Sequence, residues 1–246
     1  MPRAKSWSWS LTLALGGVAL GCGGARGGPT SPGGGPDGDT GPAGGTRGTL
    51  DAAAVARETT AASTAAEACV AEAREIVPAA GGAMTVRLVV NGAGEVTESY
   101  LADNDFGFDV TERCVLDAFR ARRWPSPRGG DLGEVTHTLT FPPAAELAAA
   151  ATWGAEDLRA AMTAEAAEGE DPFAALSEAL AGCRAAGAAG AMTATLYLDE
   201  DGLVQAVGTS ASDVAGGTAG ACVVEKIQAT TFPAPEGTTK VTLPVP

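Results

Sequence analysis

The sequence is poor in aromatic and basic residues, and each shortage limits what the protein can be. Aromatic side chains make up only 5% of the 246 residues, so any hydrophobic core is thin. Thin cores bury little surface and often need disulfide bonds. Lysine and arginine number 16 against 30 acidic residues, which gives a net charge of −14. Because this charge repels phosphate backbones, we expect no nucleic-acid partner.

Several motifs that carry chemistry are also missing. The sequence contains no phosphate-binding loop, no nucleophile elbow and no Cys-x-x-Cys. His137 is the only histidine, and a lone histidine is more often a structural residue than a base. The acidic residues 199–201 precede Gly202 and a new strand, which favours a turn over a calcium loop. We therefore predict no catalytic residue, no metal, no cofactor and no enzyme activity.

Long apolar runs are absent as well, but the N-terminus has the features of an export signal. No run of 18 apolar residues occurs, so we expect no membrane-spanning helix in the mature chain. A basic start at Arg3 and Lys5 and an apolar stretch at 11–20 predict a signal peptide over residues 1–21. Residues 18–22 (Val-Ala-Leu-Gly-Cys) resemble the lipobox of bacterial lipoproteins.

That resemblance implies cleavage before Cys22 and lipidation of its side chain. Since Gly23 rather than aspartate follows, it also implies sorting to the outer membrane, with the protein facing the periplasm. The alternative is ordinary signal cleavage that leaves Cys22 as an unpaired thiol. Residues 22–49 follow as a predicted flexible tether, because 23–49 hold twelve glycines and four prolines.

The most informative feature that is present is an internal repeat. Residues 83–127 align without a gap with residues 191–235, and twelve of the 45 positions are identical. The identical positions, each matched by the same residue 108 positions later, are Ala83, Met84, Thr85, Leu88, Gly94, Val96, Asp105, Cys114, Val115, Ala121, Pro125 and Pro127. The repeat predicts two similar folding units.

Periodicity predicts the elements of each unit. An alanine-rich helix spans 51–77 and ends before Pro78. A strand with one buried face begins near Met84, turns at 91–94 and returns from Val96, where weak alternation indicates a bulge. Asp109 and Glu112 have the spacing of a capping box, which opens a helix. We place the apolar face of that helix at Val110, Cys114, Val115, Ala118 and Phe119.

A last strand closes each unit, at 135–141 in the first copy and 239–245 in the second. The residues between the copies, 144–170, are predicted to be a broken helical linker, and Asp171 and Pro172 start the next helix. The predicted fold class is α+β, with two tandem small domains at 50–143 and 171–246. Each would pack helices on one face of a three-stranded antiparallel sheet in the order α-β-β-α-β.

Four cysteines fall as one pair per unit, Cys69 with Cys114 and Cys183 with Cys222. Both helices of a unit must pack on the same sheet face, and an exported protein forms disulfides by default. We therefore expect two structural disulfides, each contributing roughly 4 kcal/mol at most in the chain-entropy treatment. Metal binding and redox catalysis are weaker alternatives, because no histidine lies near a cysteine.

The combination of motifs resembles the AgmX/PglI C-terminal domain, a TonB-C-like module of myxobacterial envelope proteins. It rests on a cysteine-bearing helix, Met-Thr on a strand, a Gly-x-Val turn, Cys-Val on a helix and Trp/Phe-Pro before the closing strand. It covers residues 65–143 and 172–246, although Phe232 replaces the tryptophan in the second copy. The resemblance implies a non-catalytic protein-interaction module in the periplasm.

Our expected function is binding of an envelope protein or an extended peptide by strand addition, with membrane attachment through the lipid. The closing strands are the candidate edges, with Thr136, Thr138 and Thr140 in the first and Pro244 limiting the second. Arg122 and Arg123 beside Trp124 are further candidate partner contacts, unless this basic cluster is a solvated helix face. The alternatives are a purely structural envelope lipoprotein and an unrecognised envelope hydrolase.

Overall fold

The computed structural model describes residues 45–143, 150–184 and 190–246. The predicted signal peptide, Cys22 and most of the predicted tether lie outside the described residues. The first repeat contains α1 (Ala52–Ile76), β1 (Gly82–Asn91), β2 (Val96–Asn104), α2 (Asp109–Arg120) and β3 (Leu132–Phe141). The second contains α4 (Pro172–Ala181), β5 (Met192–Leu198), β6 (Val204–Ala211), α5 (Val214–Gln228) and β7 (Thr239–Val245). The α+β class and the element order α-β-β-α-β are confirmed.

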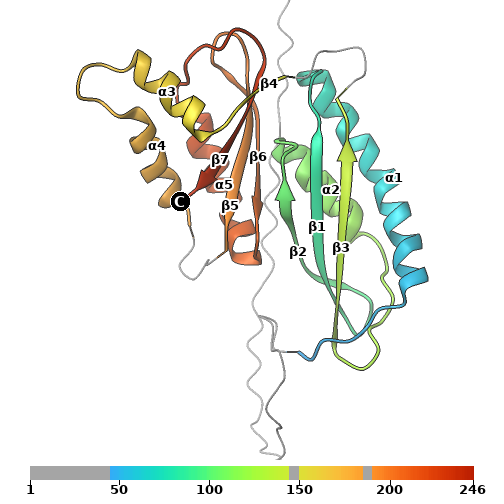
Figure 1. Cartoon of the computed structure of the whole chain (residues 1–246). Coiled ribbons are helices and arrows are strands. Elements are labelled where there is room, and N and C mark those ends of the chain that lie inside the picture. Colours follow the sequence, from blue (N-terminus) through green and yellow to red (C-terminus); the bar gives the residue numbers. More distant parts are fainter. Residues whose placement is uncertain (1–44, 144–149, 185–189) are drawn as a thin grey trace, which may run out of the picture. The chain divides into compact units, whose positions relative to one another are not determined.

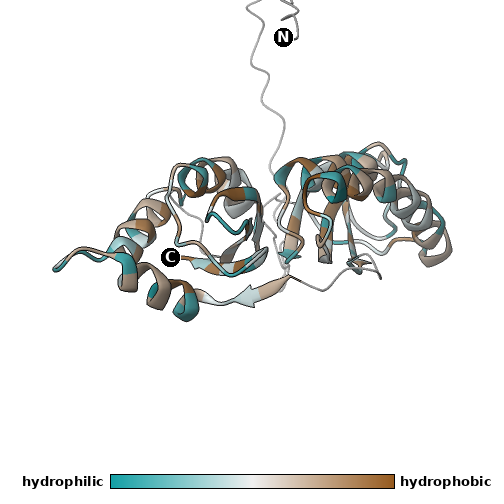
Figure 2. Cartoon of the chain, turned by 90° about the horizontal axis from the view of Figure 1, so that it is seen from above, coloured by the Kyte–Doolittle hydropathy of each residue, from teal (hydrophilic) through white to brown (hydrophobic). Residues whose placement is uncertain are grey.

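The first repeat folds as a three-stranded antiparallel sheet covered by two helices. Its strand order is β2-β1-β3, and α1 and α2 lie on one face of the sheet (Figure 1). In Figure 2, seen from above, the two helices form a separate layer beside the edge-on strands. Alternate residues of β1, Met84, Val86 and Leu88, are buried under the helices, as the period-two pattern predicts.

α1 packs closely on this sheet because its inner stripe is made of small residues. The Asp51 carboxylate caps the helix by accepting the Ala54 N–H at 2.8 Å, and the helix ends at Ile76, two residues before Pro78. Ala62, Ala66 and Ala73 are fully buried at helical spacing. The core under α1 is therefore thin, as the low aromatic content predicts.

The second repeat has a larger sheet than predicted. The strand β4 (Ala151–Trp153) lies between the repeats in sequence and pairs in parallel with the start of β7, which gives the order β4-β7-β5-β6. The prediction of a second three-stranded sheet is therefore wrong, and the predicted broken helical linker at 144–170 contains a strand before its helix. The helix α3 (Ala155–Glu165) begins after Gly154 and buries Leu158 and Met162 in the core of the second repeat.

Both repeats form the same turn within their first hairpin, between β1 and β2 and between β5 and β6. Gly94 and Gly202 have φ values of 76° and 77°, which favour glycine. A Cβ on either glycine would overlap a backbone carbonyl oxygen, that of Trp124 in the first repeat and that of Phe232 in the second. The alignment found in the sequence is therefore reproduced in local structure.

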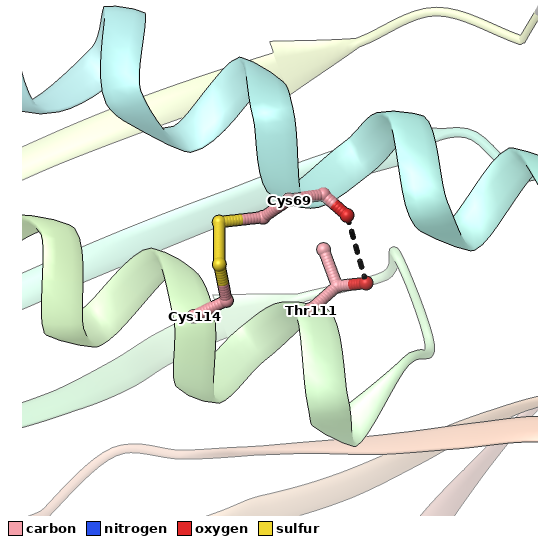
Figure 3. The surroundings of a disulfide bond; sticks show 3 residues. All are labelled: Cys69, Thr111 and Cys114. Carbon is pink, nitrogen blue, oxygen red and sulfur yellow. Dashed lines mark hydrogen bonds between the residues drawn. A yellow bond between two sulfur atoms is a disulfide. The ribbon is translucent and has the colours of Figure 1, made fainter.

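Each repeat contains one disulfide bond, which joins two of its helical segments. The Cys69–Cys114 bond links α1 to α2, with the Cα atoms 5.9 Å apart, and Thr111 Oγ1 donates to the Cys69 carbonyl beside it (Figure 3). The Cys183–Cys222 bond links the residue after the C-cap of α4 to the middle of α5, with the Cα atoms 5.5 Å apart. Both predicted pairs are confirmed.

The last five residues of the predicted tether are bonded to the first repeat. Thr49 and Arg128 exchange two backbone hydrogen bonds of 2.9 Å, and the Gly48 N–H donates to the Leu132 carbonyl at 2.7 Å. The flexible-tether prediction is therefore wrong for residues 45–49. Composition could not reveal this, because the partners are backbone groups of a loop about 80 residues later in the chain.

Candidate functional site

The outer edge of β3 presents backbone groups that no other strand uses. The Leu132 carbonyl and N–H both bond outward, to residues 46–48. The β1–β3 ladder continues without a register shift to Phe141. Because alternate residues of an antiparallel strand bond the same neighbour, Thr136, Thr138 and Thr140 direct their N–H and C=O groups away from β1. The predicted edge residues therefore face open space in the described part of the chain.

The side chains along this edge are polar and exposed. Thr136, Thr138 and Thr140 are exposed, while Val135 and Leu139 point into the core. Thr138 shares a hydrogen bond of 2.9 Å with the Thr85 hydroxyl on the neighbouring strand. These threonines suit a further strand, because hydroxyl and β-branched side chains pair well across a ladder.

The second predicted edge is mostly covered. Residues 239–241 of β7 pair with β4, so the prediction of a free edge is wrong for the first half of this strand. The remaining half contains Pro244, which pairs with Thr193 and has no N–H to donate. The reason lies in the segment 151–153, which sequence periodicity does not identify as a strand.

The three residues predicted to contact a partner, Arg122, Arg123 and Trp124, instead bond to residues of the first repeat. Trp124 is only 3% exposed, and its indole N–H donates to the Phe119 carbonyl at 3.1 Å. Arg122 pairs with Glu58 at 2.7 Å, and Arg123 pairs with Glu95 at 3.3 Å. Trp124 is therefore a core residue, and the prediction that it contacts a partner is wrong.

The predicted capping box of α2 is also wrong, and the difference identifies a second feature. Phe108, not Asp109, precedes the helix, and no side chain caps it. Asp109 pairs with Arg113 at 2.6 Å, while Glu112 turns away and is buried. Val110, predicted to be buried, is 61% exposed, because the helix is rotated to bury Thr111 and Glu112 instead.

Glu112 binds the edge strand of the other repeat. Its carboxylate accepts the backbone N–H of Thr209 on β6 at 3.0 Å. The Asn104 side-chain amide donates both to this carboxylate and to the Thr209 carbonyl, the latter at 3.1 Å. Two side chains of the first repeat therefore hold both backbone groups of one residue in the second. We call Glu112, Asn104 and Thr209 the clasp.

The electrostatics of the clasp are unusual. Burial raises the pKa of Glu112 to about 7, although hydrogen bonds from Thr209, Asn104 and Phe108 favour the charged form. The nearby Asp109 carboxylate raises the pKa further. Glu112 forms no ion pair among the described residues to offset the loss of hydration.

Further contacts between the repeats surround Tyr197. Its hydroxyl accepts the Gly81 N–H at 3.2 Å and donates to the Gly81 carbonyl at 3.1 Å. The Tyr197 ring lies 5.6 Å from that of Phe108, and Lys240 pairs with Asp105 at 3.4 Å. The first strand of each repeat was predicted to have only one buried face. Instead, Thr195 and Tyr197 on the second face of β5 are fully buried.

Sequence periodicity did not identify Glu112 and Tyr197 as contact residues, although the sequence contains one indication of the contact. The positions aligned with Glu112 and Tyr197 are Gly220 and Val89, so the contacting residues are specific to one copy. One of only two tyrosines stands on the presumed outer face of a strand, and an aromatic residue there indicates a packed surface.

A groove of about 490 Å³ lies where the repeats diverge beyond the clasp. Its walls come from β2 and α2 of the first repeat and from β6 and α5 of the second. Leu101, Leu116, Val214 and Val224 make it partly apolar. Gly217 allows α5 to approach β2 there, because a Cβ would lie 3.3 Å from the Tyr100 side chain.

The remaining sequence candidates have ordinary surroundings. His137 contacts the Ser63 hydroxyl at 3.2 Å through Nε2, and burial lowers its pKa. Residues 199–202 form a turn in which the Asp199 carboxylate accepts backbone N–H groups. Across the ranges that the structure describes, no cluster of side chains could hold a metal ion. Among the helices of the same ranges, none is long and apolar enough to cross a membrane.

The chain was compared with family models, characterised proteins and solved structures, and none of them matches it.

Proposed function

We propose that the protein is a lipid-anchored envelope protein of the AgmX/PglI C-terminal domain type that binds an extended peptide along the outer edge of β3. Cys22 would carry the lipid, and the two repeats would be tandem domains facing the periplasm from the outer membrane. The two disulfides support an oxidising compartment. The observation that carries the proposal is the row of outward backbone groups at Thr136, Thr138 and Thr140.

A short segment of the chain itself already uses this edge. Residues 46–48 lie parallel to the start of β3 and bond to Leu132 on its outer side. The edge is therefore geometrically able to accept a strand, and the positions beyond Leu132 remain open among the described residues. Strand addition obtains affinity from such main-chain bonds and specificity from alternate side chains. Arg87 and Glu134, which pair at 3.4 Å, would contact the peptide near one end.

The other strand edges are less suited to this role. β4 covers the first half of β7, and β2 and β6 lie against each other through the clasp. β3 is the edge strand whose register to its neighbour is unbroken over its whole length, whereas the pairings of β2 and β6 contain register shifts.

The test is peptide binding to the full chain. Extended peptides selected from a random eight-residue library would be measured against wild type and Thr138→Pro by fluorescence anisotropy. Proline removes the outward N–H without disturbing a bond to β1, so we expect affinity to fall at least about tenfold, which is 1.4 kcal/mol. Thr138→Val, which keeps the N–H, is the matched control and should bind as wild type does.

The position of the second repeat that corresponds to Thr138 is already a proline, Pro244, since Thr85 pairs with Thr138 and Thr193 with Pro244. Thr242→Pro therefore tests the neighbouring outward position of β7, where we expect little effect on binding. Equal affinity of wild type and Thr138→Pro would remove the β3 site from consideration. Failure to select any peptide would favour a purely structural envelope lipoprotein, the alternative that the tight contact between the repeats supports.

A further inference from the structure

We propose that the protonation state of Glu112 controls whether the two repeats stay packed together, so that their contact loosens as the pH rises from mildly acidic to mildly alkaline. This inference concerns the clasp between the repeats and is independent of the peptide site at β3.

The clasp has no room to rearrange while the repeats are packed. Glu112 is 5% exposed and Asn104 is 2% exposed. A Cβ on Gly208 would overlap the Glu112 carboxylate, and one on Gly107 would lie 3.0 Å from Thr195. The carboxylate therefore keeps little of its hydration while the repeats are packed, although Glu112 also lines the groove beyond the clasp.

The charged groups around Glu112 do not neutralise it. On its own helix, Asp109 is paired with Arg113, and Arg120 pairs with Asp117. β2 contributes Glu98 to the adjoining groove, whereas β6 and α5 contribute no charged residue to it. The remaining charged pair of the contact is Lys240 with Asp105. The Lys240 ammonium also donates to the Gly81 carbonyl.

The direction of the pH effect follows from proton linkage. Packing raises the pKa of Glu112 to about 7, while separation would return it toward the ordinary value of 4.5. The packed state therefore binds a proton that the separated state has lost, and packing is strongest at pH values below 4.5. Its advantage disappears as the pH rises through 7. From these two values, the packing equilibrium should weaken about 30-fold between pH 5.5 and pH 8.

Loosening would uncover surfaces that are hidden in the packed state. Asn104 at the end of β2 and the backbone of Thr209 on β6 would both lose their cover, and so would the face of β5 around Tyr197. The Glu112 carboxylate would become hydrated at the same time. The device would thus link environmental pH to the exposure of two strand edges.

Amide hydrogen exchange of the full chain tests the proposal at two sites. The Thr209 N–H bonds to Glu112, and the Gly81 N–H bonds to Tyr197, so both cross the contact but in opposite directions. After correction for intrinsic exchange rates, we expect the protection of both amides to fall together by about 30-fold from pH 5.5 to pH 8. The amide of Leu88, in the core of the first repeat, should keep its protection.

Two variants isolate the carboxylate. Glu112→Gln keeps the shape and removes the titration, so its protection should not vary with pH. Glu67→Gln makes the same substitution at an exposed position on α1, and it should behave as wild type does. Gly208→Ala should lower protection at Gly81 and Thr209 at every pH, because the added Cβ displaces the carboxylate.

Three outcomes would overturn the proposal. The first is protection in the wild type that does not depend on pH. The second is an unchanged pH dependence in Glu112→Gln. The third is a fall in protection at Thr209 alone, which would show local fraying of β6 while the repeats stay packed.

Discussion

Tyr197 belongs to the second repeat by sequence but is buried against the first. Its hydroxyl satisfies both backbone groups of Gly81, and its ring packs beside Phe108. Buried polar groups that lose a partner cost more than the net value of the bond. The contact between the repeats is therefore sensitive to the loss of a single oxygen atom.

We predict that Tyr197→Phe lowers the free energy of unfolding by about 1–3 kcal/mol, because the Gly81 N–H is left without its partner. Urea denaturation followed by circular dichroism would measure the change. The control is Thr136→Val, which removes an exposed hydroxyl of β3, where we expect a change within about 0.5 kcal/mol. Equal losses in the two variants would contradict a special role for Tyr197.

At the level of single residues, the sequence predicted local partners better than distant ones. Asp171 was identified as the start of a helix, and its carboxylate accepts the Ala174 N–H at 2.9 Å as an N-cap does. Asp109 and Glu112 fit the same type of pattern but do not form a cap. Whether Glu112 folds back on its helix depends on Thr209, which lies 97 residues away and leaves no signal near the helix.

Among the elements, the disulfide bonds add covalent links between helices that are also held by buried side chains. α1 presents mainly alanine to the sheet, and the bond from Cys69 joins it to α2 across a sequence separation of 45 residues. The bond at Cys183 spans 39 residues. Closing loops of this length restricts the unfolded chain by similar amounts.

Replacing Cys69 and Cys114 together by alanine should lower the free energy of unfolding by about 2–4 kcal/mol. The same change at Cys183 and Cys222 should have an effect of similar size, since the loops are similar. Denaturation of each double variant, compared with reduced wild type, would measure this. A loss below about 0.5 kcal/mol would show that packing alone holds the helices.

Element prediction succeeded where periodicity extended over a whole strand or helix. The alternation in β1 and β3 places their buried residues correctly, and the weak alternation of β2 corresponds to two register shifts. Sequence periodicity did not predict β4, because a strand of three residues is too short to show an alternating pattern. Its pairing with β7 is parallel and depends on α3 packing nearby, so local sequence could not indicate it.

At the scale of the molecule, the described residues of both repeats belong to one compact unit. The segment predicted to be a linker belongs to the second repeat, since Leu158 and Met162 lie in its core. A second domain that began at residue 171, as predicted, would lack β4, α3 and part of its hydrophobic core. β4 and α3 therefore belong with the second repeat.

We expect a fragment of residues 150–246 to be at least about 3 kcal/mol more stable than a fragment of residues 171–246, because the shorter one loses two buried side chains and a strand. Chemical denaturation of both fragments, with the Cys183–Cys222 bond intact, would compare them. If the two were equally stable, residues 150–170 would be a linker after all.

The mutual covering of β2 and β6 has a consequence for solutions of many molecules. Each strand hides the other within one chain, but nothing in the clasp requires its two halves to come from the same polypeptide. Chains that open together would exchange halves on closing and become interlocked pairs, with every original contact restored between neighbours. High protein concentration would therefore favour reversible domain-swapped dimers, which need no additional contact surface.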